Sequence, residues 1–145
     1  LVYDVRNKHN KPIYESTVRT QKHTDPVWQI RWNPDTSKKY NFYSISSDGR
    51  VTNWILMKNK LEPEEVMKLK LVVDQDKDLT EKKETFLYGL AGGMCFDFNP
   101  IETHKFIVGT EEGKIHLCSK TYAGQYLMTY TGHFLAVYSV KWNKC

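Results

Sequence analysis

The chain has 145 residues, which is the size of one ordinary domain. Hydrophobic residues make up 40% and charged residues 26%, as in a typical globular protein, and the formal net charge of +4 is spread along the chain. This mild charge argues against a nucleic-acid-binding surface, and no apolar run approaches the roughly 18–20 residues that cross a bilayer. We therefore expect neither nucleic acid nor a membrane among the partners.

Short strand-like runs separated by turn signals dominate the sequence and predict an all-β fold. The expected strands, in chain order, are residues 2–5, 12–19, 26–33, 41–46, 50–57, 64–73, 92–99, 105–110, 113–119, 124–131 and 136–143. Asp48-Gly49 and Glu112-Gly113 each lie between two of these runs, as tight hairpin turns require.

The runs also form an internal repeat. Residues 23–34, 89–100 and 133–143 align with one another, and the aligned segments start 66 and then 44 residues apart. In each segment every second residue near the end is apolar, which predicts one face of a strand. These residues are Trp28, Ile30 and Trp32; Met94, Phe96 and Phe98; and Tyr138, Val140 and Trp142. Residues 42–54 and 106–118 align as well, and the shorter spacing matches one blade of a β-propeller.

The repeat predicts a partial β-propeller of antiparallel four-stranded blades whose ring is not closed. Residues 1–19 would be the end of one blade, 23–73 a full blade, 74–85 a charged loop, 86–131 a second full blade and 132–145 the start of the next. Residues 74–85 contain almost no apolar side chain, so we interpret them as a solvated loop or, alternatively, as a loop that docks a partner. The repeat is interrupted at both ends, and we expect a fragment of a longer chain.

Three cysteines, Cys95, Cys118 and Cys145, lie far apart and not in a metal-binding spacing. Two of them fall inside apolar runs. We predict that they are buried free thiols, which is typical of an intracellular protein.

The first full blade has the order His23, then Ser46-Ser47-Asp48-Gly49, then Trp54, and this order resembles the WD-repeat family. The resemblance implies a structural tetrad in which His23, Ser46, Asp48 and Trp54 are hydrogen-bonded to one another. Such a network would tie a loop, a strand and a turn together, and the Trp N–H needs an acceptor once it is buried. A catalytic interpretation of the His, Ser and Asp is disfavoured, because the repeat already explains them.

The second full blade is degenerate at the same four positions. Gly89 stands in place of the His, Thr110 of the Ser, Glu112 of the Asp and Cys118 of the Trp. This set cannot form the tetrad, so we expect the second blade to be held together by packing.

Three stretches, residues 22–32, 46–54 and 106–120, resemble the axonemal dynein intermediate chains, and within that family the intermediate chain 1 group of the outer arm. The run Val-Gly-Thr-Glu-Glu-Gly-Lys-Ile at 108–115 departs from generic WD repeats in the same way as that family does. The resemblance covers nearly all of the chain apart from residues 74–85.

The resemblance implies a non-catalytic scaffold subunit of an axonemal outer-arm dynein, located in the cytoplasm on the cytoskeleton of the ciliary axoneme. Its propeller would bind the tail of a dynein heavy chain, and the other intermediate chain and the light chains would be further partners. The alternative is a generic WD-repeat adaptor outside cilia, such as a cytoplasmic dynein chain or a ubiquitin-ligase receptor.

Residues at strand starts and just before the turn acid lie on the narrow face of WD propellers, which often meets partners. By alignment these partner-binding candidates are Trp28, Ser47, Met94, Glu111 and Tyr138. Aromatic side chains of this kind are plausible hot spots. The alternative for Trp28, Met94 and Tyr138 is that they pack between blades.

No other pattern points to chemistry. None of the five histidines has zinc-type spacing to another ligand, and no nucleophile has a base at a recognisable spacing. Gly92-Gly93 stands alone and is interpreted as close packing or a bulge, not as a phosphate-binding loop. We therefore predict no enzymatic activity, no cofactor, no metal and no small-molecule substrate.

Overall fold

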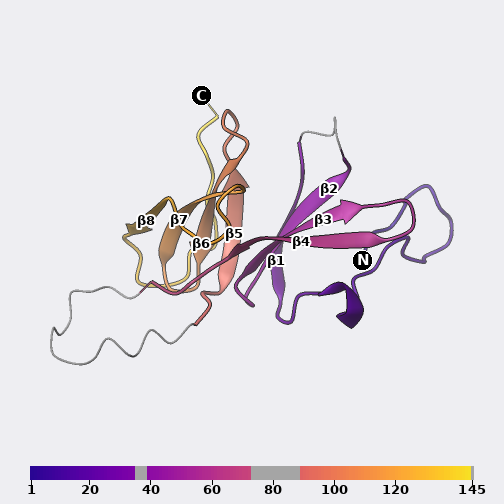
Figure 1. Ribbon diagram of the computed structural model, residues 1–145, viewed down its shortest axis with the longest axis horizontal. Helices are drawn as coiled ribbons and strands as arrows, with labels where there is room; N and C mark the ends of the chain where they lie inside the picture. Colours follow the sequence, from indigo (N-terminus) through magenta and orange to yellow (C-terminus); the bar gives the residue numbers. More distant parts are fainter. Residues whose placement is uncertain (35–38, 73–88, 145) are drawn as a thin grey trace.

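The computed structural model describes residues 1–34, 39–72 and 89–144, and these residues form two four-stranded antiparallel sheets (Figure 1). In the first sheet β1 (Val27–Trp32), β2 (Asn41–Ser46), β3 (Arg50–Leu56) and β4 (Leu61–Lys68) follow one another in sequence order. The second sheet repeats this order with β5 (Gly93–Phe98), β6 (Lys105–Thr110), β7 (Lys114–Ser119) and β8 (Met128–Thr131). We call the two sheets blade 1 and blade 2.

The predicted fold class is confirmed. The chain is all-β, and the two sheets do not close into a barrel or ring, as expected for part of a propeller. Within the described ranges the one helix is the single turn η1 (Val18–Thr20), so none is long and apolar enough to cross a bilayer.

Both blades turn tightly between their second and third strands at a glycine. Gly49 and Gly113 have φ angles of +79° and +82°, a conformation that side chains with a Cβ rarely adopt. The start of the following repeat crosses closely over each turn. A Cβ on Gly49 would lie 2.5 Å from the Cβ of Leu90, and one on Gly113 would lie 2.4 Å from the carbonyl oxygen of His133. The glycines therefore permit both the turn and the passage of the next segment over it.

The inner strands β1 and β5 each carry an irregularity near their start. The register shifts between Val27 and Gln29 in β1 and between Gly93 and Cys95 in β5. Trp28 and Met94 are the extra residues at these two bulges. A bulge re-aims the side chain that it carries, so the repeat places a redirected residue at the same point of each blade.

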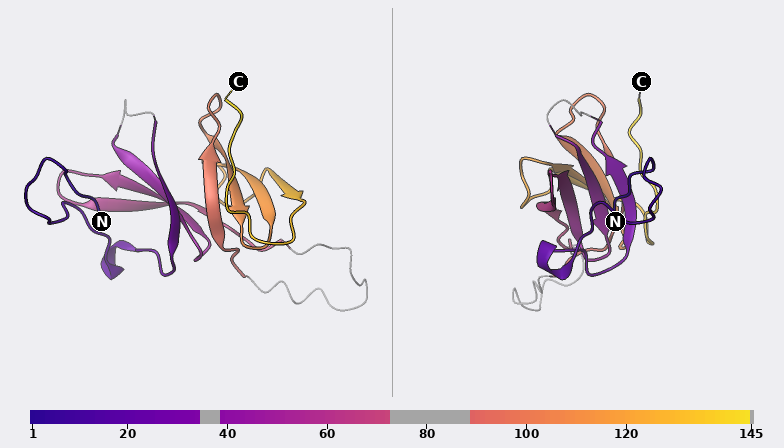
Figure 2. Two further views of the ribbon diagram at one scale, coloured as in Figure 1. Left: turned by 180° about the vertical axis from the view of Figure 1, so that it is seen from behind. Right: turned by 90° about the vertical axis from the view of Figure 1, so that its right-hand side faces the viewer.

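One core joins the blades. Figure 2 shows β5 beside β1. The core contains residues of both sheets and of the segments after β4 and before β5: Tyr43, Ile45, Val51, Val66, Met67, Leu69, Ala91, Phe96, Phe106, Val108 and Cys118. Gly93 fits against blade 1 because it lacks a side chain, since a Cβ there would meet Ile45 at 2.5 Å. The interpretation of Gly92-Gly93 as close packing or a bulge therefore holds for Gly93.

The structure departs from the expected strands at both ends of the chain. Residues 2–5 and 12–17 contain one isolated bridge, Val2 to Tyr14, in place of two strands, and the end of the second expected strand lies in η1 (Val18–Thr20). Residues 136–143 form no strand either. For residues 136–143 the reason is the pairing rule of the repeat: β1 and β5 each pair with the strand that follows them, and the described residues contain no strand after 136–143.

Other boundaries differ by a few residues. Strand β4 begins at Leu61, not at residue 64, and β8 begins at Met128, not at residue 124. The predicted loop at 74–85 and Cys145 lie outside the described residues. Cys95 and Cys118 are free and buried, as predicted.

Candidate functional site

A polar network lies on the face of blade 1 that points away from blade 2. The Nδ1 atom of His23 donates to the Asp48 carboxylate over 2.9 Å, and the indole N–H of Trp54 donates to the Ser44 hydroxyl over 2.7 Å. The Ser44 hydroxyl in turn lies 2.6 Å from Nε2 of His23, to which it can donate its own hydrogen. The network therefore runs from the turn carboxylate through the imidazole and the hydroxyl to the indole.

The serine in this network is Ser44, and the prediction of Ser46 was wrong. Both serines lie on the same face of β2, because side chains alternate along a strand. Trp54 pairs with Phe42 in the ladder, so its indole reaches the diagonal neighbour Ser44, whereas Ser46 is one step further along the face. Ser46 has another role: its hydroxyl donates to the carbonyl oxygen of Asp25 over 3.0 Å and accepts the amide N–H of Asp48.

The Asp48 carboxylate is almost fully satisfied by donors. Besides His23, it accepts the amide N–H of Thr24 at 3.1 Å and the amide and guanidinium of Arg50 at 3.0 and 2.9 Å. Burial by itself would raise the pKa of Asp48, but the hydrogen bonds from His23 and Arg50 outweigh it and hold the pKa below its usual value. The carboxylate thus stays charged and ties the loop before β1 to the turn after β2.

Blade 2 fills the equivalent space without a tetrad. Cys118, at the position of Trp54, is fully buried against blade 1, and burial raises the pKa of its thiol to about 12. His116 stacks on the ring of Tyr126 with a centroid distance of 3.8 Å, and its Nδ1 atom lies 2.9 Å from the Thr129 hydroxyl. Burial, together with the charge of Lys114, lowers the pKa of His116 to about 4, so this imidazole is neutral near pH 7.

Three of the five partner-binding candidates form a hydrogen-bonded chain across the two blades. The indole N–H of Trp28 donates to the Ser47 hydroxyl over 2.6 Å, and that hydroxyl donates to the Glu111 carboxylate over 2.8 Å. Trp28 and Ser47 belong to blade 1 and Glu111 to blade 2. We call these three residues the bridging triad; it lies at the end of the blades where β1 and β5 begin.

The absence of a side chain at Gly92 leaves space for the Glu111 side chain of the bridging triad. A Cβ on Gly92 would lie 2.4 Å from the carboxyl carbon of Glu111, so the Glu111 side chain occupies space that any other residue at position 92 would fill. The Glu111 amide also donates to the Gly92 carbonyl over 2.8 Å. Glu111 is thereby aimed at Ser47 although it lies on an exposed turn.

The two remaining candidates, Tyr138 and Met94, differ in their exposure to solvent. Tyr138 is 75% exposed, and Trp28 is 53% exposed, whereas Met94 is buried at 7%. Met94 is therefore not available as an exposed anchor. The physical reason is position: β5 has β1 on one side and the segment around Val137 and Trp142 on the other, whereas β1 has a neighbouring blade on one side only.

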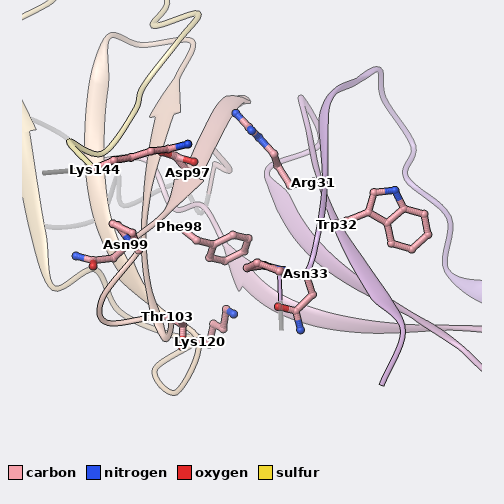
Figure 3. A pocket seen from close by; sticks show the side chains of 11 residues that line it. Arg31, Trp32, Asn33, Asp97, Phe98, Asn99, Thr103, Lys120 and Lys144 are labelled. Carbon is pink, nitrogen blue, oxygen red and sulfur yellow. The ribbon is translucent and has the colours of Figure 1, made fainter. Parts of the chain in front are cut away.

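A groove of about 360 Å³ lies between the blades where β1 and β5 end, opposite to the bridging triad (Figure 3). Figure 3 shows Arg31 on one side of it, Asp97 and Lys144 on the other, and Phe98 between them. Both Asn-Pro turns, at residues 33–34 and 99–100, contribute to its lining. Among the described residues no group of three or more His, Cys, Asp or Glu side chains is placed to hold a metal ion.

Known proteins resemble this chain over nearly its whole length. The 78 kDa intermediate chain of the flagellar outer-arm dynein of Chlamydomonas reinhardtii is 52% identical over 146 residues, which cover 99% of this chain and 21% of the relative. Ciliary dynein intermediate chain 2 of Heliocidaris crassispina is 46% identical over 144 residues, and axonemal dynein intermediate chain 1 of Bos taurus is 43% identical over 144 residues. Each of these two alignments covers 98% of this chain and 20% of the relative. This chain is homologous to axonemal dynein intermediate chains.

The predicted resemblance to the axonemal intermediate chains, with outer-arm members among the relatives, is confirmed. The names of the relatives, flagellar, ciliary and axonemal, agree with the predicted location at the cytoskeleton of the cilium. This intermediate-chain homologue spans about a fifth of the length of the curated relatives that it matches. No protein-family model matches the chain.

Sequence reasoning missed several residues that shape the surface of this intermediate-chain homologue. The Gln29 amide oxygen accepts the amide N–H of Phe96 over 2.8 Å and so links the two inner strands. Lys120 and Lys144 line the groove together with Arg31. The one signal that points to the groove is the repetition of Asn-Pro at the ends of two aligned strands, because it places two similar turns at the same end of neighbouring blades.

Proposed function

We propose that this chain is part of a non-catalytic scaffold subunit of an axonemal outer-arm dynein, and that its propeller binds the tail of a dynein heavy chain. The other intermediate chain and the light chains are further expected partners in the same assembly. The names of the relatives, which are outer-arm and axonemal dynein intermediate chains, support a place in the dynein assembly. The observation that carries the binding surface is the bridging triad, since it joins two blades into one surface that ends in an exposed tryptophan.

The bridging triad has the properties of an interface anchor. An exposed tryptophan offers a large apolar area, and partly buried Trp and Tyr side chains dominate the binding energy of many protein interfaces. The hydrogen bonds from Trp28 to Ser47 and from Ser47 to Glu111 fix the indole before a partner arrives. Less rotamer entropy is then lost on binding. Tyr138 supplies a second exposed aromatic ring in the next repeat.

A structural role for the His23 network supports the non-catalytic assignment. The order Asp48, His23, Ser44 has the connectivity of a hydrolase triad, because the imidazole bonds the carboxylate on one side and the hydroxyl on the other. However, Ser44 is only 2% exposed and its oxygen also accepts the indole N–H of Trp54. A hydroxyl that is enclosed and engaged in this way has no room for an acyl substrate.

Heavy-chain capture tests the proposal. The intact protein carrying Trp28→Ala or Tyr138→Ala is compared with the wild type for retention of the heavy-chain tail, and Tyr40→Ala is the matched control because Tyr40 is an exposed aromatic residue (68%) of blade 1 outside the bridging triad. We expect Trp28→Ala to weaken binding about tenfold or more, as for an interface hot spot, and Tyr40→Ala to leave it unchanged. Full retention by a folded Trp28→Ala protein, checked by thermal melting, would show that Trp28 is not the anchor.

A further inference from the structure

The groove between the ends of β1 and β5 is a separate feature from the bridging triad. Each inner strand has six residues, and the bulge residue lies near one end while Arg31 and Phe98 lie at the other. A strand rises about 3.3 Å per residue, so the two regions are on the order of 10 Å apart along β1. The groove and the bridging triad are therefore distinct parts of the surface.

Positive charge predominates in the groove. Arg31, Lys120 and Lys144 line it, and among the lining residues that the structure describes Asp97 is the one acidic side chain. The Asp97 carboxylate already accepts the amide N–H of Trp142 over 2.9 Å. The half-buried Arg31 side chain makes no hydrogen bond or ion pair with the residues that the structure describes. A half-buried guanidinium in such a place favours an incoming anion.

Lys120 is held in place by aromatic rings. Its ammonium lies 4.3 Å from the centroid of Phe98, in blade 2, and 4.8 Å from that of Tyr43, in blade 1. Cation–π contacts at this distance are attractive and restrict a side chain that is otherwise flexible. The groove thus contains a positioned cation at the junction of the two blades.

We propose that this groove binds an acidic peptide segment of a partner protein. The three cations complement carboxylate side chains, which are the charged groups of an acidic peptide. A volume of about 360 Å³ is at the small end of ligand sites and fits a few residues of an extended segment. A nucleic acid fits less well, because the net charge of +4 is spread along the chain and supplies no basic stripe for a phosphate backbone.

Fluorescence anisotropy with the intact protein and a fluorescein-labelled hexaglutamate peptide tests the proposal. The double variant Arg31→Glu/Lys144→Glu is compared with Lys8→Glu/Lys58→Glu, which makes the same change in net charge at exposed lysines outside the groove. We expect the groove variant to weaken binding about tenfold or more and the control to weaken it less than about twofold at the same salt concentration. Lys120→Met, which keeps the apolar stem, should also weaken binding.

Three results would overturn the proposal. Equal weakening by both double variants would mean that the peptide senses only net charge. Equal binding of a hexaglutamine peptide would mean that carboxylates are not recognised. Tighter binding of a single-stranded oligonucleotide, lost in the groove variant, would identify a nucleic-acid site. Acetylation footprinting of the wild type avoids any folding defect of the variants: hexaglutamate should protect Lys120 and Lys144 and leave Lys58 reactive, and protection of all three equally would also contradict the site.

Discussion

Blade 1 and blade 2 share their strand order, their turn glycines and the bulge at the start of the inner strand, yet they fill one equivalent position in opposite ways. In blade 1 the position holds Trp54, whose indole joins a hydrogen-bonded network with Ser44, His23 and Asp48. In blade 2 it holds Cys118, which lies in the core between the blades.

The difference follows from what covers each face. The Cys118 face of blade 2 packs on blade 1, and the apolar core that it shares with Ile45 and Val51 helps to stabilise it. The Trp54 face of blade 1 is covered by residues near the N-terminus, of which Val2 and Tyr14 pack on a small cluster around Trp54. A blade that packs on a neighbour can lose its polar network, whereas blade 1 uses its own side chains to connect loop, turn and strand.

The largest expected effect comes from the position at which the blades differ. Trp54→Ala should lower the free energy of unfolding by about 3–5 kcal/mol, because it removes a buried ring and leaves Ser44 without its donor. Cys118→Ala should cost about 1 kcal/mol, since little volume is lost. Denaturant unfolding of the two variants measures the contrast, with Trp32→Ala as a control because that tryptophan is 58% exposed. Equal losses from Trp54→Ala and Trp32→Ala would contradict the assignment.

The blades should also respond to acid at different pH values. The pKa of His116 is about 4 in the folded protein against an ordinary 6.5, so the unfolded chain binds the proton more tightly. The contribution of the neutral imidazole to the free energy of unfolding is complete above pH 6.5. It is lost as the pH falls toward 4, at up to about 1.4 kcal/mol per pH unit.

Asp48 behaves in the same direction at lower pH. The pKa of Asp48 in the folded protein lies below the ordinary 3.8. Its contribution to the free energy of unfolding is therefore present above pH 3.8 and is lost only as the pH falls below that value. The free energy of unfolding, measured from pH 7 to pH 4, should therefore report on blade 2. The variant His116→Gln should reduce the slope of this free energy against pH in that range. A slope unchanged by His116→Gln would show that another group is responsible.

A smaller effect distinguishes the two serines of β2. A double-mutant cycle between Ser44→Ala and Trp54→Phe should give a coupling free energy of about 1 kcal/mol, because the indole and the hydroxyl are bonded directly. The same cycle with Ser46→Ala should be additive within about 0.5 kcal/mol, since Ser46 bonds the loop carbonyl of Asp25. Coupling to Ser46 and not to Ser44 would restore the assignment made from sequence.

The sequence predicted the features that are local and failed at those that depend on neighbours. The Asp48-Gly49 turn could be predicted because the turn chemistry is contained in adjacent residues. Ser44 and Ser46 could not be distinguished, because both satisfy the alternating pattern and only the reach of the Trp54 indole separates them. The periodic pattern also predicted a strand at 136–143, where the described residues contain no following strand to pair with it.

The candidate partner-binding surface was likewise predictable where it depends on local sequence and not where it depends on neighbouring segments. Alignment placed Trp28, Ser47 and Glu111 at equivalent ends of the blades, and the structure links them by hydrogen bonds. It could not show that Met94 is buried, because that depends on β1 and on the segment around Val137, which lie on either side of β5. The cations of the groove were missed because residues 31, 120 and 144 are far apart in sequence and meet only when two blades pack together.

Photo-crosslinking within assembled outer-arm dynein tests the binding surface most directly. The photoreactive amino acid p-benzoylphenylalanine is placed at Trp28 in one preparation and at Tyr40 in another, since both side chains are exposed on blade 1 and only Trp28 belongs to the bridging triad. We predict a heavy-chain adduct from position 28 and none from position 40. A heavy-chain adduct from position 40 together with none from position 28 would contradict the claim that the bridging triad faces the heavy chain.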